Sequence, residues 1–149
     1  MEYLTLCKQY LKAINAGSLP LVLSLFESPE AIVRSPIYGQ MTAGTYYRIL
    51  FSDTRDAIIR IRHVYEALSD TPSIALHFSY TCITGNGHTV EFDGVDVFEL
   101  TADETHFTKL TIIYDPTHIG LTPRLPQHPG RIGAANLDLP AYNLELKFI

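Results

Sequence analysis

The chain has 149 residues, of which 46% are hydrophobic and 18% charged, and its formal net charge is -5. This length suits one domain with a hydrophobic core, and the composition excludes a disordered chain. Every apolar run falls short of the roughly 18 residues that a spanning helix needs, and no Lys/Arg cluster is present, so membrane and nucleic-acid proteins are disfavoured.

The N-terminus and the two cysteines give an expectation for the cellular compartment. The first residues show no basic start followed by a long apolar core, so we expect no signal peptide. Cys7 and Cys82 form neither a zinc-ligand spacing nor a disulfide framework. Both lie in apolar patterns, so we interpret them as reduced core thiols and expect a cytoplasmic protein.

The first third of the chain predicts three helices. Over Glu2–Ala16, apolar side chains recur at three- and four-residue steps, and Tyr10 shares their face, so it is expected to point inward. Gly17 suits the end of that helix, and Ser18 suits the N-cap of the next. There follow a short helix over 19–26, an extended piece over 31–34, a loop over 35–39 and a helix over 43–51.

The middle of the chain predicts antiparallel strands. Residues 57–67 alternate, with Ile59, Ile61, His63 and Tyr65 on one side. Residues 73–100 form a hairpin, and residues 106–115 form a last strand. Three helices followed by such strands indicate an α+β fold, with helices packed on one face of a curved sheet.

The central hairpin contains Asn86-Gly87, a strong signal for a two-residue type I′ turn. With these two as the loop residues, His77 falls opposite Asp96, on a face that also carries Phe98. A carboxylate facing an imidazole among aromatic rings indicates a pocket with titratable groups. The sequence is equally compatible with a satisfied polar pair, or with a register shifted by one residue that separates the two.

Several motifs in this order and spacing resemble one family. They are Tyr10 to Gly17 with its Asn-Ala-Gly end, Ser35-Pro36 after the second helix, Val95 to Phe98, and the last strand. From Leu4 to Asp115 the chain resembles the ketosteroid isomerase and SnoaL-like branch of the nuclear-transport-factor-like proteins. The resemblance implies a cone-shaped, curved antiparallel sheet with three N-terminal helices packed on its concave face.

The same resemblance implies a chemistry. Tyr10 and Asp96 fill the two oxyanion-hole positions of the steroid isomerases, and the position of the proton-shuttling base falls on Ser35. A serine hydroxyl has no useful basicity near neutral pH, so the enolising base is missing. If Asp96 is protonated, it donates to Tyr10 or a ligand oxygen. If it is ionised, it orients His77 as the base.

The candidate site therefore has two groups of residues. The candidate catalytic residues are Tyr10, His77 and Asp96. We expect them to share a cavity with Phe98, Leu110, Ile112 and Tyr114, with Ser35 and Tyr38 near its mouth. The scattered histidines form no ligand set, so we expect no metal, and no cofactor motif is present.

Two classes of function fit this site. One is a cofactor-independent isomerase, cyclase, dehydratase or hydrolase acting on a small apolar, oxygen-bearing molecule. The alternative is a non-catalytic module that uses the same fold to bind a ligand or to dimerise.

The end of the chain differs in composition. Residues 116–149 contain five of the nine prolines and end in a strand-like stretch over 141–149, so we predict a domain over 1–115 and a C-terminal extension. We also expect a homodimer in which the extension takes part. The outer sheet face predicted for this contact carries Leu76, Phe78, Tyr80, Val95 and Val97.

Overall fold

The computed structural model of the chain describes residues 2–53, 57–83 and 89–119. Its elements are α1 (Glu2–Ala16), α2 (Leu19–Ser24), β1 (Ile32–Ser35), β2 (Gly39–Thr42), α3 (Ala43–Asp53), β3 (Ala57–Glu66), β4 (Ser73–Ile83), β5 (Thr89–Leu100), β6 (Phe107–Ile113) and the short 3-10 helix η1 (Pro116–Ile119). The bounds of α1 are those predicted from its periodicity. Strand β2 lies partly where a loop was predicted.

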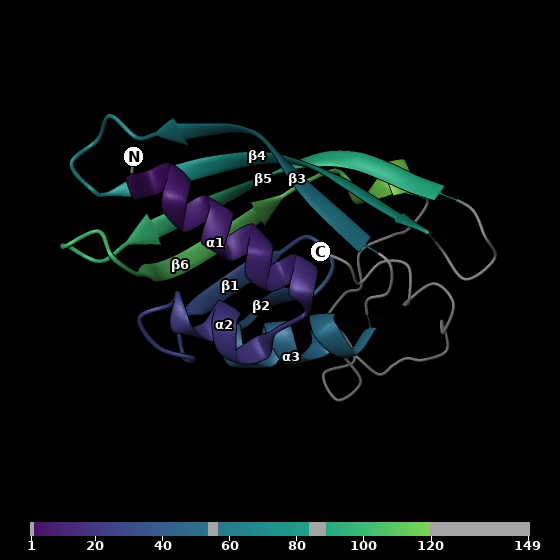
Figure 1. Cartoon of the computed structure of the whole chain (residues 1–149), viewed down its shortest axis with the longest axis horizontal. Helices are drawn as coiled ribbons and strands as arrows, with labels where there is room; N and C mark the ends of the chain where they lie inside the picture. The colour runs from purple at the N-terminus through teal and green to yellow at the C-terminus, as the bar shows by residue number, and fades with distance from the viewer. Residues whose placement is uncertain (1, 54–56, 84–88, 120–149) are drawn as a thin grey trace.

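The strands form one curved, mixed sheet in the order β2-β1-β6-β5-β4-β3. Strands β1 and β6 pair in parallel, and the other neighbours pair antiparallel. Figure 1 shows α1 running across one face of the sheet, with α2 and α3 gathered near β1 and β2. The predicted α+β class with helices on one sheet face is therefore confirmed, with one parallel strand pair added.

The core lies between the helices and the inner face of the sheet. Strand β4 alternates strictly between buried and partly exposed positions, as a strand with one covered face does. Large side chains from β4, β5 and β6 meet the helices there, and the most completely buried include Phe78, Tyr80, Phe98, Phe107 and Leu110.

The edge strand β3 is held by α1. The side-chain amide of Asn15 accepts a hydrogen bond from the backbone N–H of Ile59 at 3.0 Å and donates one to its carbonyl at 3.2 Å. These two bonds satisfy backbone groups on the open side of β3, where an edge strand would otherwise offer them to another chain. They also fix the end of α1, and hence Tyr10, relative to the sheet.

The register of the central hairpin differs from the prediction. His77 pairs with Val95, and Asp96 pairs with Leu76. Five residues separate the last facing pair, Ile83 and Thr89. In a hairpin with a two-residue turn, the number of residues between any facing pair is even, so the observed pairing does not fit that turn. Because side chains alternate with a period of two, this change of parity turns every side chain of one strand to the other face. The Asn86-Gly87 turn itself lies outside the described residues.

Two consequences correct the predictions. His77 and Asp96 lie on opposite faces of the sheet, so the predicted pairing of the two is wrong. Leu76, Phe78 and Tyr80, predicted on the outer face, are buried against the helices instead. Only the valines of that predicted outer set, Val95 and Val97, are placed on the outer face among the described residues.

Strand β3 contains a second change of register. The pairing with β4 shifts between Ile61 and His63, so Arg62 is an extra residue in β3. Ile59 therefore lies inside, while His63 and Tyr65 lie outside and are exposed. The predicted single apolar face of this strand is broken at the bulge.

The described chain ends with η1, beside β5. The remainder of the predicted C-terminal extension lies outside the described residues. No helix in the described ranges is long and apolar enough to cross a membrane.

Candidate functional site

Asp96 is the one carboxylate among the buried residues that the structure describes, and only 4% of it is exposed. It lies in β5, and on the inner face of the sheet it is flanked by Leu76 of β4 and Ile112 of β6. Its Oδ1 atom has no hydrogen-bond partner among the described residues. Burial raises the pKa of the Asp96 carboxyl well above its usual value, because the apolar surroundings disfavour the charged form. The apolar surroundings therefore favour the protonated form of the Asp96 carboxyl.

A pair of tyrosines supplies a second polar group. The hydroxyls of Tyr10 on α1 and Tyr47 on α3 lie 2.6 Å apart, and both residues are buried. One hydroxyl donates to the other, and the accepting hydroxyl keeps its own proton to donate. Burial is the main cause that raises the pKa of Tyr10, and the neighbouring Tyr47 raises it further. Burial also raises the pKa of Tyr47, so both phenols stay protonated.

The carboxyl of Asp96 lies within electrostatic reach of this pair. Burial is the largest cause of the raised pKa values of Tyr46 and Tyr47, and the charge that Asp96 would carry is a smaller cause in both. It acts in the same way on Cys7 of α1, whose pKa burial raises to about 12. The site thus gathers α1, α3 and β5 around one carboxyl group.

Aromatic rings pack around the Tyr10–Tyr47 pair. The ring of Tyr10 packs edge-on against Phe98, with centroids 4.9 Å apart, and Phe98 stacks on Phe107 at 4.0 Å. Toward the start of β5, Phe92 stacks on Tyr114, with centroids 5.1 Å apart. Such rings create an apolar environment in which a single hydrogen bond is stronger than in water.

The structure brings most of the predicted site residues into one interior. Tyr10, Asp96, Phe98, Leu110, Ile112 and Tyr114 are all buried on the inner side. The predicted alternation of Leu110, Ile112 and Tyr114 is confirmed. That they line a cavity together stays a prediction.

Ser35 and Tyr38 belong to the hairpin between β1 and β2. Ser35 is buried, and its hydroxyl accepts a hydrogen bond of 3.1 Å from the backbone N–H of Tyr38. This bond gives Ser35 a structural role in the turn. Tyr38 is half-buried, and its ring packs edge-on against Tyr46.

His77 takes part in a different cluster, on the outer face. Its Nε2 atom lies 3.1 Å from Oδ2 of Asp93, and its ring stacks on His63 with centroids 5.6 Å apart. His77 therefore cannot act on a ligand held by Asp96, because the sheet itself lies between them.

Sequence reasoning missed Tyr46 and Tyr47. They follow each other in a helix, so one periodic stripe does not include both, and no inward face was predicted for this helix. Both are fully buried because α3 is enclosed on two sides. The sequence feature that could have identified them is the pair of adjacent tyrosines in a short helix that packs on a sheet.

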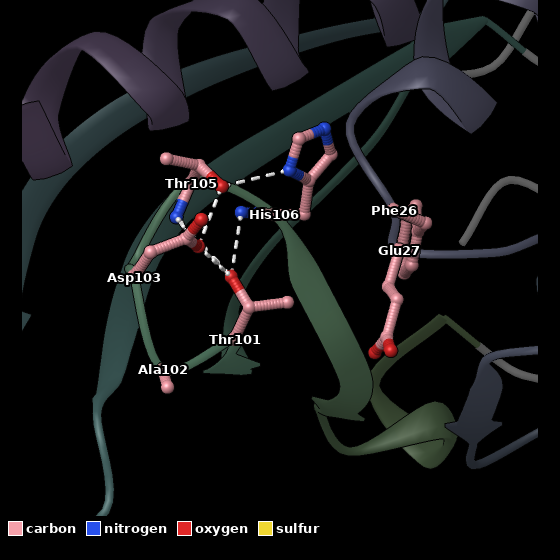
Figure 2. A pocket seen from close by; sticks show the side chains of 7 residues that line it. All are labelled: Phe26, Glu27, Thr101, Ala102, Asp103, Thr105 and His106. Atoms are coloured by element: carbon pink, nitrogen blue, oxygen red, sulfur yellow. Dashed lines mark hydrogen bonds between the residues drawn. The ribbon is translucent and has the colours of Figure 1, made fainter.

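A separate surface pocket lies beside the loop that joins the end of β5 to the start of β6. Its volume is about 500 Å³, and Figure 2 shows it bordered by the loop 101–106 and by Phe26 and Glu27. The Asp103 carboxylate accepts hydrogen bonds from Thr101 and Thr105, which lower its pKa. These bonds stabilise the loop, so we interpret Asp103 as a structural residue.

In the described ranges, no group of three or more His, Cys, Asp or Glu side chains could hold a metal ion. Cys7 and Cys82 are buried and are not disulfide-bonded.

Comparisons with known proteins identify the fold. No family model and no curated protein matches the sequence. Among solved structures, a hypothetical protein with a ketosteroid isomerase-like fold from Catenulispora acidiphila, in complex with trimethylamine, has 10% identity and a TM-score of 0.65, covering 76% of this chain and 88% of that one.

Two further structures agree. A candidate polyketide cyclase from Pseudomonas putida has 20% identity and a TM-score of 0.61, covering 76% of this chain and 91% of that one. Rv0760c from Mycobacterium tuberculosis, in complex with estradiol-17beta-hemisuccinate, has 13% identity and a TM-score of 0.61, covering 77% and 95%.

The chain thus has the nuclear-transport-factor-like α+β fold, in the form shared by ketosteroid isomerase-like and SnoaL-type proteins. The resemblance drawn from Tyr10, Asp96 and the last strand is confirmed at the level of the fold. At these identities the likeness establishes the fold alone.

Proposed function

We propose that this protein binds a small apolar molecule that carries an oxygen acceptor, and that neutral Asp96 is its main polar contact. The observation that supports this most strongly is the buried Oδ1 atom of Asp96, which has no hydrogen-bond partner among the described residues. Structural neighbours crystallised with small organic molecules support the same role.

The energetics favour a ligand at this place. A buried polar group without a partner costs roughly 1–3 kcal/mol, and a ligand oxygen that accepts from Asp96 would remove that cost. The Tyr10–Tyr47 pair offers a second donor to the same oxygen. Around these atoms the aromatic rings favour a flat, apolar ligand body.

Binding is better supported than isomerisation. Moving a proton on a ketosteroid requires a base beside the ligand. The hydroxyl of Ser35 is not basic and already accepts the N–H of Tyr38. His77 lies on the outer face. We therefore expect no appreciable Δ5-3-ketosteroid isomerisation, and Tyr10 and Asp96 act as hydrogen-bond donors.

The binding experiment uses two probes that share a naphthalene body. Acetonaphthone carries a carbonyl, and ethylnaphthalene does not. With Asp96→Ala, the ketone should bind about tenfold more weakly, because one hydrogen bond to a buried donor is lost, while the hydrocarbon should bind as before. Asp93→Ala, on the outer face, is the matched control. Equal ketone affinity in the wild type and Asp96→Ala would refute the role of Asp96.

We also propose that the chain forms a homodimer through the outer face of its sheet. In the described strands, that face carries Ala75, Val95, Val97 and the exposed Tyr65 and Ile113 side by side, between charged rows that contain Glu99 and Asp93. An apolar patch with a polar rim is typical of a contact surface. The proposal also includes one domain over residues 1–115 followed by a C-terminal extension over 116–149, a role for that extension in the dimer, and a cytoplasmic location.

A further inference from the structure

We infer that the interior around Asp96 also binds apolar molecules that carry a basic amine, and that it holds them as ammonium ions against the Asp96 carboxylate. This inference rests on the proposed ligand-binding function and adds a second class of ligand to it. It follows from the charges around Asp96 rather than from its hydrogen bonds.

The interior lacks a positive charge in the part of the chain that the structure describes. The buried polar side chains there are Ser35 and Asp96, together with tyrosines and cysteines, and no Lys, Arg or His is among the buried residues. Burial is the sole cause found for the raised pKa of Asp96, with no cationic neighbour acting against it. An ionised Asp96 would therefore have no counterion among the buried residues that the structure describes.

A bound ammonium ion would supply that counterion. It would donate to Oδ1, the atom that has no partner, and a charge-assisted hydrogen bond is shorter and stronger than one between neutral groups. An isolated buried carboxylate is strongly disfavoured, whereas a paired and hydrogen-bonded one is tolerated.

The aromatic surroundings favour the same ligand. Tyr10, Tyr47 and Phe98 are linked by ring contacts of 4.9 to 6.3 Å between centroids, and the charge of Asp96 acts on the two tyrosines. The faces of aromatic rings attract cations, most strongly where water is excluded. A buried carboxylate within electrostatic reach of two packed tyrosine rings suits a substituted ammonium group, because both attract a cation.

The two classes of ligand should differ in pH dependence. A ketone needs protonated Asp96, so its affinity should be constant at low pH and fall above the raised pKa of that carboxyl. An ammonium ion displaces the proton of Asp96, so its affinity should rise about tenfold per pH unit below that pKa. The sign of the slope therefore distinguishes the two modes.

The experiment compares acetonaphthone with dimethylaminomethyl-naphthalene on the wild type and on Asp96→Asn, by calorimetry between pH 5 and 8 in roughly one-unit steps. The asparagine amide still donates to a carbonyl but cannot neutralise a cation. We expect Asp96→Asn to keep the ketone within a few-fold and to lose the amine by tenfold or more, as an order-of-magnitude effect.

Each outcome has one meaning. Ketone binding without amine binding in the wild type overturns this inference and leaves the proposed function standing. Equal amine affinity in the wild type and Asp96→Asn also overturns it. Failure of both probes to bind counts against the proposed function itself, and the far-ultraviolet circular dichroism of each variant confirms that it is folded.

Discussion

Asp96 is a carboxylic acid in an interior of aromatic rings, and burial rather than a neighbouring charge sets its protonation. In an unfolded chain the same group ionises near pH 4, as aspartate ordinarily does, to within about half a unit. The folded state therefore holds a proton that the unfolded state releases. This difference links the stability of the fold to pH.

The direction of that link follows from the raised pKa. Below the unfolded pKa both states hold the proton, and the contribution of Asp96 to stability is fully present. As the pH rises toward the folded pKa, the free energy of unfolding should fall by about 1.4 kcal/mol per pH unit. Asp96→Asn cannot titrate, so this slope should be missing from the variant, as urea unfolding at several pH values would show.

The comparison of slopes isolates Asp96, because every other titratable group is common to both proteins. Asp103→Asn is a useful second variant, since its pKa is lowered and its effect has the opposite sign. Parallel stability curves for the wild type and Asp96→Asn would contradict a neutral Asp96.

At the scale of the elements, a single glycine determines how β4 and β5 pack beside Asp96. Gly94 is paired with Phe78, and a Cβ atom at Gly94 would lie 2.5 Å from Cζ of that ring. The ring of Phe78 therefore lies directly over Gly94 and occupies the space that a side chain at this position would need.

Gly94→Ala should destabilise the protein by about 1–3 kcal/mol, because the buried ring of Phe78 must leave its position. Gly44→Ala is the control: the nearest atoms of Pro29 lie 3.5 Å from its Cβ position, and alanine favours the helix α3. Thermal unfolding of both variants measures the effect. Equal stability of Gly94→Ala and the wild type would show that the ring yields freely.

The sequence predicted the elements well because each has a clear period. The bounds of α1 and the positions of the long strands follow from spacings of three to four and of two residues. The hairpin register failed because it depends on whether the loop is odd or even, which Asn86-Gly87 did not determine.

The bulk of the side chains in β4 is a better guide to the hairpin register than the Asn86-Gly87 pair. Leu76, Phe78 and Tyr80 are the bulkier set of β4, and placing them on the same face as Phe92 and Phe98 agrees with the observed register, in which Tyr80 pairs with Phe92. The Tyr10–Tyr47 contact could not be predicted from spacing, because it joins residues 37 positions apart through the packing of two helices.

At the scale of the whole molecule, the outer face of the sheet is the surface through which we propose that the chain dimerises. Tyr65 and Ile113 are 55% and 52% exposed on it. The edge strand β3 is blocked by Asn15, so the face rather than this edge is expected to make the contact.

Val97→Glu should convert the proposed dimer to a monomer, because it places a charge in the middle of the apolar patch. Lys12→Glu, on the exposed side of α1, should leave the dimer intact. Sedimentation at micromolar concentration measures both. A wild-type monomer rejects the dimer, and an unchanged dimer in a chain ending at Ile119 rejects a role for the extension.

The most direct test of the account is the protonation of Asp96 itself, followed by a carbon NMR titration of the aspartate carboxyl groups. The resonance of Asp96 is assigned by its loss in Asp96→Asn. We predict that this carboxyl remains protonated at neutral pH in the ligand-free protein. A titration midpoint near the ordinary value of 3.8 would contradict it, and with it the proposed mode of binding.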